Sequence, residues 1–281
     1  MITNNSNKNT EDISAIILTY NEEKHIKRCI LSIKKITKKI IVIDSYSNDK
    51  TLALCKKQNI QVLTNSYKNH AQQLNWALKN INLKTKWLIR IDADEILENN
   101  FKKKFLQIKD INNYNALNIL IEHNFLGNRI KHGGVYPQYQ IRIWKRNEGI
   151  YDNKPMDEKL ILTNPKIYTS DLRIIDYNLK GFYFWLKKHQ LYANREANLY
   201  LLLKKKTLKI KNFDKKLKEK IFYYKFPIFL RPFLLFFYRY IIKKGFLDGF
   251  VGIKFNILQT LYYRFLVDCF ILTKIVLNNK K

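Results

Sequence analysis

The sequence KWLIRIDADEIL, residues 86–97, passes from an apolar run directly into three acids, Asp92, Asp94 and Glu95. The apolar part has the length and composition of a buried strand. Ligands of parallel sheets bind beyond the carboxyl ends of the strands, and these acids follow such an end. The segment is therefore either a strand with an ordinary polar loop or one edge of a site for a metal ion and a phosphate.

Three similar apolar runs precede this one, at residues 13–18, 39–44 and 60–63. Helical patterns separate them, and residues 19–33 predict a helix that carries two acids in its first turn. Strands that are almost entirely apolar and alternate with helices are typical of a parallel sheet covered on both faces. The first hundred residues therefore predict an α/β fold.

Polar residues follow several of these strands. Each alone suits a helix cap or a turn, but the carboxyl ends of parallel strands meet at one edge of a sheet. We therefore expect these side chains to converge on one site; they are Thr19, Tyr20 and Asn21 after the first strand, Asp44 after the second, and Asp92 and Asp94 after the fourth.

The pattern changes after Glu98. Residues 114–134 and 136–146 predict antiparallel strands joined by glycine turns, and residues 166–177 predict another strand. From Gly181 onward, apolar and aromatic residues recur at spacings of three and four, which indicates helices. The chain thus has an α/β part followed by a helical extension.

The chain of 281 residues carries 52 Lys and Arg against 23 Asp and Glu, a formal net charge of +29. Such an excess favours an anionic partner: a nucleic acid, a membrane surface or a phosphorylated substrate. The excess is densest in residues 181–281, where 22 basic and 5 acidic residues give +17. Large aromatics alternate with cations there, as in amphipathic helices that lie in a lipid headgroup layer. Helices that only pack on the α/β domain are the alternative.

Several classes of protein are disfavoured. The three cysteines lack CxxC spacing, which favours a reducing compartment and disfavours a zinc site. The polar start has no secretory signal pattern, and no uncharged apolar run is long enough for a membrane span. A basic nucleic-acid-binding protein remains an alternative, but the chain has no RNP, zinc or helix-turn-helix signature, and no nucleic acid is expected as partner.

Four segments carry a resemblance to a known family: AIILTYNEEKHIKRCILSI (15–33), IIVIDSYSNDKT (40–51), HAQQLNWAL (70–78) and WLIRIDADE (87–95). With them the chain resembles the family 2 glycosyltransferases, which have the nucleotide-sugar-binding GT-A fold. HNFLGNRIKHGGVYPQYQIRIWKR (123–146), LKKHQLYANREA (186–197) and KKGFLDGFVG (243–252) are similar to the subgroup that adds hexoses, often glucose, to the lipopolysaccharide inner core.

The resemblance implies a role for each residue of the donor side. Asp94 is the implied ligand of a divalent cation, Mg²⁺ or Mn²⁺, and Glu95 is expected to be structural. The implied contacts of a UDP-sugar donor are Thr19, Tyr20, Asn21 and Glu22 around the nucleotide, Asp44 at the base, Gln72 and Asn75 beside the sugar-nucleotide, and Asp92 near the ribose and diphosphate.

The family inverts the anomeric centre in one displacement, so a carboxylate must take the proton of the acceptor hydroxyl. The subgroup has a His-Glu pair at this place, whereas this chain has Asp157 and Glu158 in KPMDEKL. Glu158 aligns with the Glu of the pair and is the favoured base, with Asp157 as the alternative. A glycosyltransferase-like subunit without activity is the other reading of this departure.

The acceptor side is expected to include His132, Gly133, Gly134 and Arg195. The implied acceptor is a lipid-linked or phosphorylated saccharide, so the protein is expected to lie in the cytoplasm, peripheral on the inner face of the cytoplasmic membrane. The expected domains are a GT-A domain at 1–180, with a donor half at about 12–98 and an acceptor half at about 99–180, and a membrane-associating helical region at 181–281.

Overall fold

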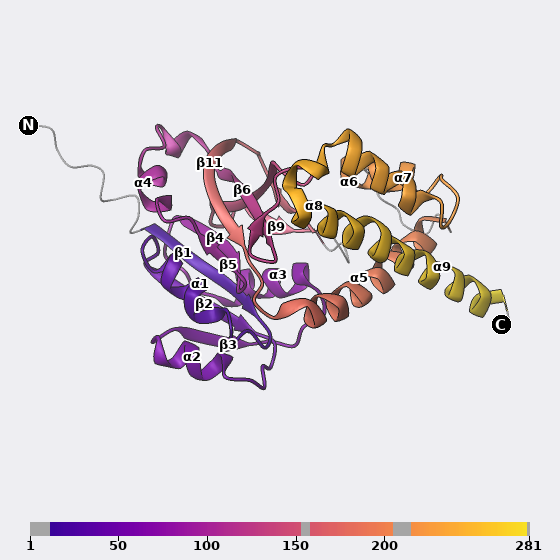
Figure 1. Cartoon of the computed structure of the whole chain (residues 1–281). Helices are drawn as coiled ribbons and strands as arrows, with labels where there is room; N and C mark the ends of the chain where they lie inside the picture. Colours follow the sequence, from indigo (N-terminus) through magenta and orange to yellow (C-terminus); the bar gives the residue numbers. More distant parts are fainter. Residues whose placement is uncertain (1–11, 153–157, 205–214, 280–281) are drawn as a thin grey trace, which may run out of the picture. The chain divides into compact units, whose positions relative to one another are not determined.

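The computed structural model describes residues 12–152, 158–204 and 215–279 (Figure 1). The chain divides into two compact units. The first, here called the sheet unit, comprises Met1–Arg129 and Pro137–Leu179. The second, the helical unit, comprises Lys180–Lys281 together with the short segment Ile130–Tyr136, which leaves the sheet unit and returns to it.

The sheet unit is built on one mixed sheet. Its first four strands along the chain are parallel neighbours, as the apolar runs predicted, and the later strands add antiparallel pairs. The strand order is β3 (Gln61–Thr64), β2 (Lys39–Asp44), β1 (Ile13–Thr19), β4 (Trp87–Asp92), β8 (Gln138–Lys145), β6 (Ala116–Phe125), β11 (Ile167–Asp176) and β5 (Glu95–Leu97); β7 (Asn128–Arg129) pairs with β6, and β9 (Gly149–Tyr151) pairs with β10 (Leu160–Leu162).

Both faces of the sheet are covered. Because successive side chains of a strand point to opposite faces, one strand contributes to both cores. Ile13, Ala15 and Ile17 of β1 share a core with α1 (Ile26–Ile33), α2 (Thr51–Lys57) and α4 (Phe101–Leu106). Ile16 and Leu18 of the same strand share a second core with α3 (His70–Asn80), β9 and β10. A short 3₁₀ turn, Ile111–Asn113, precedes β6. The α/β prediction is confirmed.

The start of α1 differs from the expectation. The helix begins at Ile26, and its first turn holds no acid. Residues 21–25 form a turn instead, because Asn21 has a positive φ of 54° and the Glu22 N–H donates to Thr51 Oγ1 at 2.7 Å. Hydrogen bonds to the start of α2 thus override the local helical pattern.

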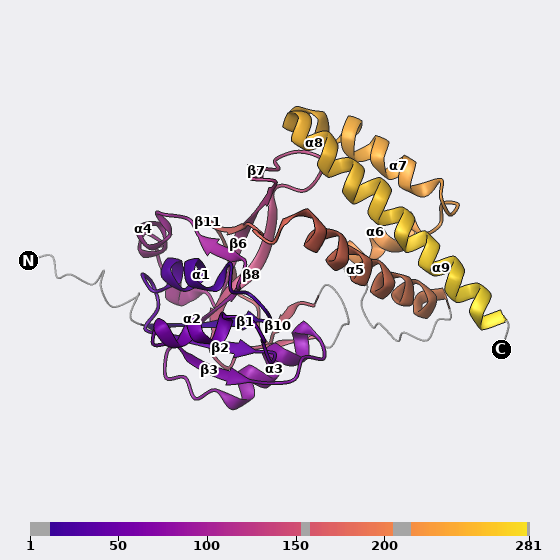
Figure 2. The same cartoon turned by 60° about the horizontal axis from the view of Figure 1, so that its bottom comes forward.

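The helical unit confirms the expected C-terminal helices. In it α9 packs along α5 around Ala193, Ala197 and Val267 (Figure 2). No helix among the described residues is long and apolar enough to cross a membrane. The elements are α5 (Gly181–Lys204), α6 (Lys215–Tyr223), α7 (Arg231–Phe237), the π-helix η3 (Tyr238–Ile242), the 3₁₀-helix η4 (Gly245–Asp248), α8 (Gly249–Asn256), the π-helix η5 (Ile257–Tyr262) and α9 (Tyr263–Asn279).

Candidate active site

The strand ends meet as the sequence predicted. Thr19 at the end of β1 pairs in register with Asp44 at the end of β2. On the other side of β1, Leu18 pairs with Asp92 at the end of β4. Three of the polar residues predicted to bind a nucleotide-sugar therefore lie at one edge of the parallel half of the sheet.

Asp44 organises the turn that follows β2. Its buried carboxylate accepts hydrogen bonds from Thr19 Oγ1 at 2.9 Å, from the Ser47 N–H at 2.7 Å and from Ser47 Oγ at 2.5 Å. Tyr20 and Tyr46, in the turns after β1 and β2, have exposed rings. Exposed aromatic faces beside this edge suit the stacking of a nucleobase, while Asp44 and Thr19 fix the backbone that carries them.

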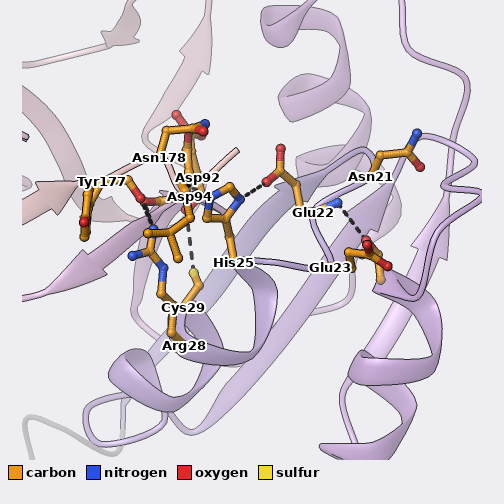
Figure 3. A network of polar contacts seen from close by, with 12 residues as sticks. Asn21, Glu22, Glu23, His25, Arg28, Cys29, Asp92, Asp94, Tyr177 and Asn178 are labelled. Atoms are coloured by element: carbon orange, nitrogen blue, oxygen red, sulfur yellow. Dashed lines mark hydrogen bonds and ion pairs between the residues drawn. The ribbon is translucent and has the colours of Figure 1, made fainter. Parts of the chain in front are cut away.

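Asn21 and Glu22 continue the same edge (Figure 3). Asn21 Oδ1 accepts from the Asn48 N–H at 2.9 Å, which ties the turn after β1 to the turn after β2. The Glu22 carboxylate lies 2.5 Å from His25 Nδ1, and His25 Nε2 accepts from the Leu179 N–H at 2.7 Å. Because Nε2 is an acceptor, the ring proton lies on Nδ1 and is donated to Glu22.

Two buried arginines surround Asp92. Arg90 Nε and Nη2 lie 3.3 Å and 3.4 Å from the two carboxylate oxygens of Asp92, and Arg142 Nη1 lies 3.6 Å from one of them. Burial alone raises the pKa of a carboxyl group, yet Arg90 and Arg142 hold the pKa of Asp92 well below its usual range. Asp92 is therefore a carboxylate throughout the physiological pH range.

Arg90 also reaches Glu158, the favoured base. Its Nη1 lies 3.2 Å from Glu158 Oε1, and the guanidinium lies over the ring of Tyr151 at 5.5 Å. Both carboxylates are thus held by different nitrogens of one guanidinium. Asp157, the alternative base, lies outside the described residues.

Glu95 has a structural environment, as expected. Its side chain is buried, and its carboxylate accepts hydrogen bonds from Arg142 Nη2 at 2.5 Å and from the Asp92 N–H at 2.8 Å. Burial raises the pKa of Glu95 to about 8, although the charge of Arg142 opposes the rise. Glu95 therefore fixes the backbone at Asp92 and orients Arg142.

Asp94 lies in a loop that is tied to the segment after β11. Its backbone carbonyl accepts from Arg28 Nη2 at 3.0 Å and from the Tyr177 N–H at 3.2 Å, and its Oδ2 accepts from Asn178 Nδ2 at 3.0 Å (Figure 3). Arg28 also donates to the Tyr177 carbonyl. The carboxylate is only partly buried, so it can take part in a further interaction on its solvent side.

The donor set around Asp94 constrains a metal ion. Among the described residues, no group of three or more His, Cys, Asp or Glu side chains is placed to hold one. Mg²⁺ commonly takes one or two protein carboxylates and completes its octahedron with phosphates and waters. Asp94 therefore fits a cation that binds together with a diphosphate.

The two predicted residues of α3 have different environments. Gln72 is exposed, and its N–H donates to the helix cap Asn69 at 2.8 Å. Asn75 exchanges two hydrogen bonds with the backbone of Tyr151, at 2.8 Å and 2.9 Å. Asn75 thereby positions β9 and the Tyr151 ring that covers Arg90.

The residues predicted for the acceptor side belong to the helical unit. Asp248 accepts from the His132 N–H at 2.8 Å and from His132 Nδ1 at 2.7 Å, and Gly133 N–H donates to the Lys243 carbonyl at 2.9 Å. Gly133 and Gly134 both have positive φ, and Arg195 is exposed on α5. His132 is thus strongly held, which fits a structural role and leaves its predicted acceptor role untested.

The residues that sequence reasoning missed are Arg90, Arg142 and Tyr151. The last paired residues of the antiparallel strands β4 and β8 are Ile89 and Ile143. Arg90 and Arg142 occupy the next position on each strand, so their like charges project from the same face of the sheet. Each is flanked by isoleucines, and an arginine inside an apolar strand is the signal that could have identified them. Nε and Nη1 of Arg142 are buried and have no hydrogen-bond partner among the described residues. Buried N–H groups of this kind are placed to donate hydrogen bonds to an oxygen of a ligand.

The sequence also matches a known protein family. The family description "Glycosyl transferase family 2" matches residues 14–168, more than half of the chain. The chain therefore belongs to glycosyl transferase family 2, and its α/β fold is of the GT-A type. This match gives the family and not the lipopolysaccharide inner-core subgroup within it.

Individual relatives match over shorter stretches. An uncharacterized glycosyltransferase of Rickettsia conorii is 39% identical over 88 residues, which is 31% of this chain and 30% of that protein. The glycosyltransferase SunS of Bacillus subtilis is 28% identical over 116 residues, 40% of this chain and 27% of SunS. The matched part thus spans less than a third of these relatives.

Two solved structures show a distant likeness. TarS of S. aureus, in complex with UDP-GlcNAc, aligns with a TM-score of 0.42 and 15% identity over 65% of each chain. Glucosyl-3-phosphoglycerate synthase of Mycobacterium tuberculosis, in complex with Mn²⁺, UDP and phosphoglyceric acid, aligns with a TM-score of 0.33 and 20% identity, over 40% of this chain and 43% of that one.

Proposed function

We propose that the protein is an inverting glycosyltransferase that moves a hexose from a UDP-sugar to a hydroxyl of a lipid-linked saccharide, with Glu158 as general base. One observation carries this proposal: Arg90 holds both Asp92 and Glu158. An acid at the donor edge and a second carboxylate from a distant loop are thereby kept side by side. The chemistry needs one carboxylate near the donor and another at the acceptor hydroxyl.

The reaction is a single displacement. The acceptor oxygen bonds to the anomeric carbon while the bond from that carbon to the diphosphate oxygen breaks, and UDP leaves with the electron pair. The acceptor proton passes to Glu158, which must be ionised to receive it. A divalent cation held by Asp94 together with the diphosphate would neutralise the charge that develops on the leaving group.

The other groups have supporting roles. Nε of Arg142, which has no hydrogen-bond partner among the described residues, suits an oxygen of the diphosphate or of the sugar. Tyr20 and Tyr46 suit the face of the base. Glucose as the hexose, the lipopolysaccharide core as the acceptor and the inner face of the cytoplasmic membrane as the location follow from the subgroup resemblance and form part of the proposal.

The decisive experiment separates binding from chemistry. Thermal shifts with UDP-, GDP-, ADP- and CMP-sugars, each with Mn²⁺, identify the donor, because a ligand of the folded state raises the melting temperature. Glu158→Gln should keep the shift caused by the donor and lose transfer by about 100-fold or more. Asp171→Asn is the matched control, because this carboxylate is 78% exposed and belongs to the same unit.

Each other outcome points to a defined alternative. Full transfer by Glu158→Gln, combined with loss in Asp157→Asn, would make Asp157 the base. Donor binding without transfer to any saccharide would indicate a glycosyltransferase-like subunit without activity. No shift with any sugar-nucleotide, together with salt-dependent retention on DNA, would favour a nucleic-acid-binding protein.

A further inference from the structure

The helical unit has an unusual distribution of polarity, with charges inside. Arg231 and Asp268 are both fully buried, and Asp268 accepts from Arg231 Nε and from the Phe229 N–H, each at 2.9 Å. Glu196 is also buried, and it accepts from Arg264 and from Tyr263 Oη. The Arg231–Asp268 pair ties the start of α7 to α9, and the contacts of Glu196 tie α5 to α9. The side of α7 opposite Arg231 is directed away from this buried pair.

That other face is apolar and exposed. Seven large side chains recur at spacings of three and four along α7 and η3, and each is between 43% and 59% exposed. Phe246, Leu247 and Phe250, in the next turns, are 44%, 54% and 73% exposed. We call these ten side chains the apolar stripe; the first seven are Leu230, Phe233, Leu234, Phe237, Tyr238, Ile241 and Ile242. Scattered exposed apolar residues are normal, but seven at the spacing of one helix side, followed by three more in the next turns, mark an interaction surface.

The charges around the apolar stripe have one sign. From Ile221 to Lys281 the sequence has only two acids, Asp248 and Asp268. Their side chains are 6% and 0% exposed, respectively. Lys225, Lys243, Lys244 and Lys254 are exposed in the same segment. The apolar stripe therefore has cations beside it and no exposed acid among the described residues of this segment.

We propose that the apolar stripe inserts into the headgroup and upper acyl region of an anionic lipid bilayer, with these lysines at the phosphates. Apolar side chains flanked by cations match a surface that is apolar within and negatively charged at its boundary. A second copy of the chain fits less well, because two such surfaces would bring like charges together. The inference rests on the proposed function in one respect, the lipid-linked acceptor that would be reached at the bilayer. Binding of the apolar stripe to lipid does not itself require glycosyl transfer.

The test is flotation of the full chain with vesicles of phosphatidylglycerol and phosphatidylethanolamine, compared with vesicles of phosphatidylcholine. Phe237→Gln/Ile242→Gln removes two members of the apolar stripe that are 58% and 59% exposed. The partition coefficient should fall by roughly tenfold or more, because the buried apolar area is lost. Leu31→Gln/Leu52→Gln, which changes two exposed leucines of the sheet unit, should leave it unchanged.

Salt separates the two contributions. Lys243→Gln/Lys244→Gln should lower binding at low salt and make it less sensitive to salt, because fewer cations meet the lipid phosphates. The apolar variant should lose the part of the binding that resists salt. Tryptophan at position 237 (Phe237→Trp) should be quenched by brominated lipid when vesicles are added, whereas Leu31→Trp should not.

Several results would overturn the proposal. Equal flotation of Phe237→Gln/Ile242→Gln and the unchanged protein, with both folded by circular dichroism, would exclude insertion of the apolar stripe. Concentration-dependent dimers that this variant abolishes, without flotation of the unchanged protein, would assign the surface to a second copy instead. Hydrolysis of the donor in solution, measured in parallel, should be the same in this variant, so failure of lipid binding can be told from failure of the proposed catalysis.

Discussion

Nη1 of Arg90 lies 3.2 Å from Oε1 of Glu158, so a strand residue beside Asp92 holds the carboxylate proposed as the base. Replacement of Arg90 by methionine would leave both carboxylates without their shared cation. A buried charge that loses its partner is costly, and we expect the free energy of unfolding to fall by about 3 kcal/mol. Urea unfolding followed by circular dichroism measures the change.

The control for Arg90 is Lys102→Met, because Lys102 is an exposed cation of the same unit. Arg90→Lys should lose less stability than Arg90→Met, because it keeps a cation at this position, and should transfer more slowly than the unchanged protein, since an ammonium group cannot reproduce the fork that reaches two carboxylates. Equal stability of Arg90→Met and Lys102→Met would show that the contacts of Arg90 contribute nothing to the fold.

Binding of the cation should depend on the nucleotide. Because the described residues include no three-ligand cluster, Mn²⁺ alone should give little heat in isothermal titration calorimetry, and Mn²⁺ added with UDP should bind. Asp94→Ala should abolish the enhancement by UDP, while Asp171→Asn should keep it. Tight binding of Mn²⁺ without nucleotide would contradict this prediction.

Glu95 should make the protein less stable as the pH rises. Burial raises the pKa of Glu95 from 4.5 to about 8, so between these values the folded chain holds a proton that the unfolded chain has released. Its contribution to the free energy of unfolding is therefore complete below pH 4.5 and declines as the pH rises through 8, by at most about 1.4 kcal/mol per pH unit. Urea unfolding at a series of pH values should show this slope, and Glu95→Gln should remove it.

Asp92 should have the opposite dependence. Because its pKa is held below the usual range, its contribution is present at neutral pH and is lost only in acid. The free energy of unfolding of Glu95→Gln can be subtracted from that of the unchanged protein at each pH. If this difference changed only at acid pH, it would contradict the assignment of the raised pKa to Glu95.

Gly133 and Gly134 offer a matched pair of alanine substitutions. Their φ values are nearly equal, 72° and 73°, so the conformational strain of alanine is the same at both. A Cβ at Gly133 would lie 3.2 Å from Asn256 Oδ1, whereas the nearest atom at Gly134 is Lys243 Cγ at 3.7 Å. Gly133→Ala should therefore be less stable than Gly134→Ala by about 1 kcal/mol in thermal unfolding. Equal melting temperatures would show that Asn256 moves aside without cost.

Much of the sheet unit could be predicted because its information is local. Apolar runs of strand length located β1, β2 and β4, and the parallel arrangement followed from the helices between them. Once the strands are parallel, the meeting of Thr19, Asp44 and Asp92 at one edge follows from geometry alone. The antiparallel pairing of β6 with β8 also followed from the glycine turns between them.

The interactions within the site could not be predicted, because they join distant parts of the chain. Nothing near Arg90 in the sequence indicates that Glu158 is its partner, and nothing near His132 indicates Asp248. The start of α1 was predicted wrongly for the same reason: the hydrogen bond from Glu22 to Thr51 has no local signature. The sequence left open whether the C-terminal helices face lipid or pack on the α/β domain, because a spacing of three and four indicates an apolar face and does not say what covers it.

The short segment Ile130–Tyr136 has a practical consequence for exchanging the helical unit between relatives. It is encoded between β7 and β8, yet it is compact with the C-terminal helices, and Asp248 accepts from Lys131 and His132. A chimera joined only near residue 180 would combine the C-terminal helices of a relative with the native segment Ile130–Tyr136. The N–H groups of Lys131 and His132 would then lose Asp248, their hydrogen-bond acceptor. Such hybrids must transplant two pieces of the gene together, and their failures when only one is moved would reflect folding and not catalysis.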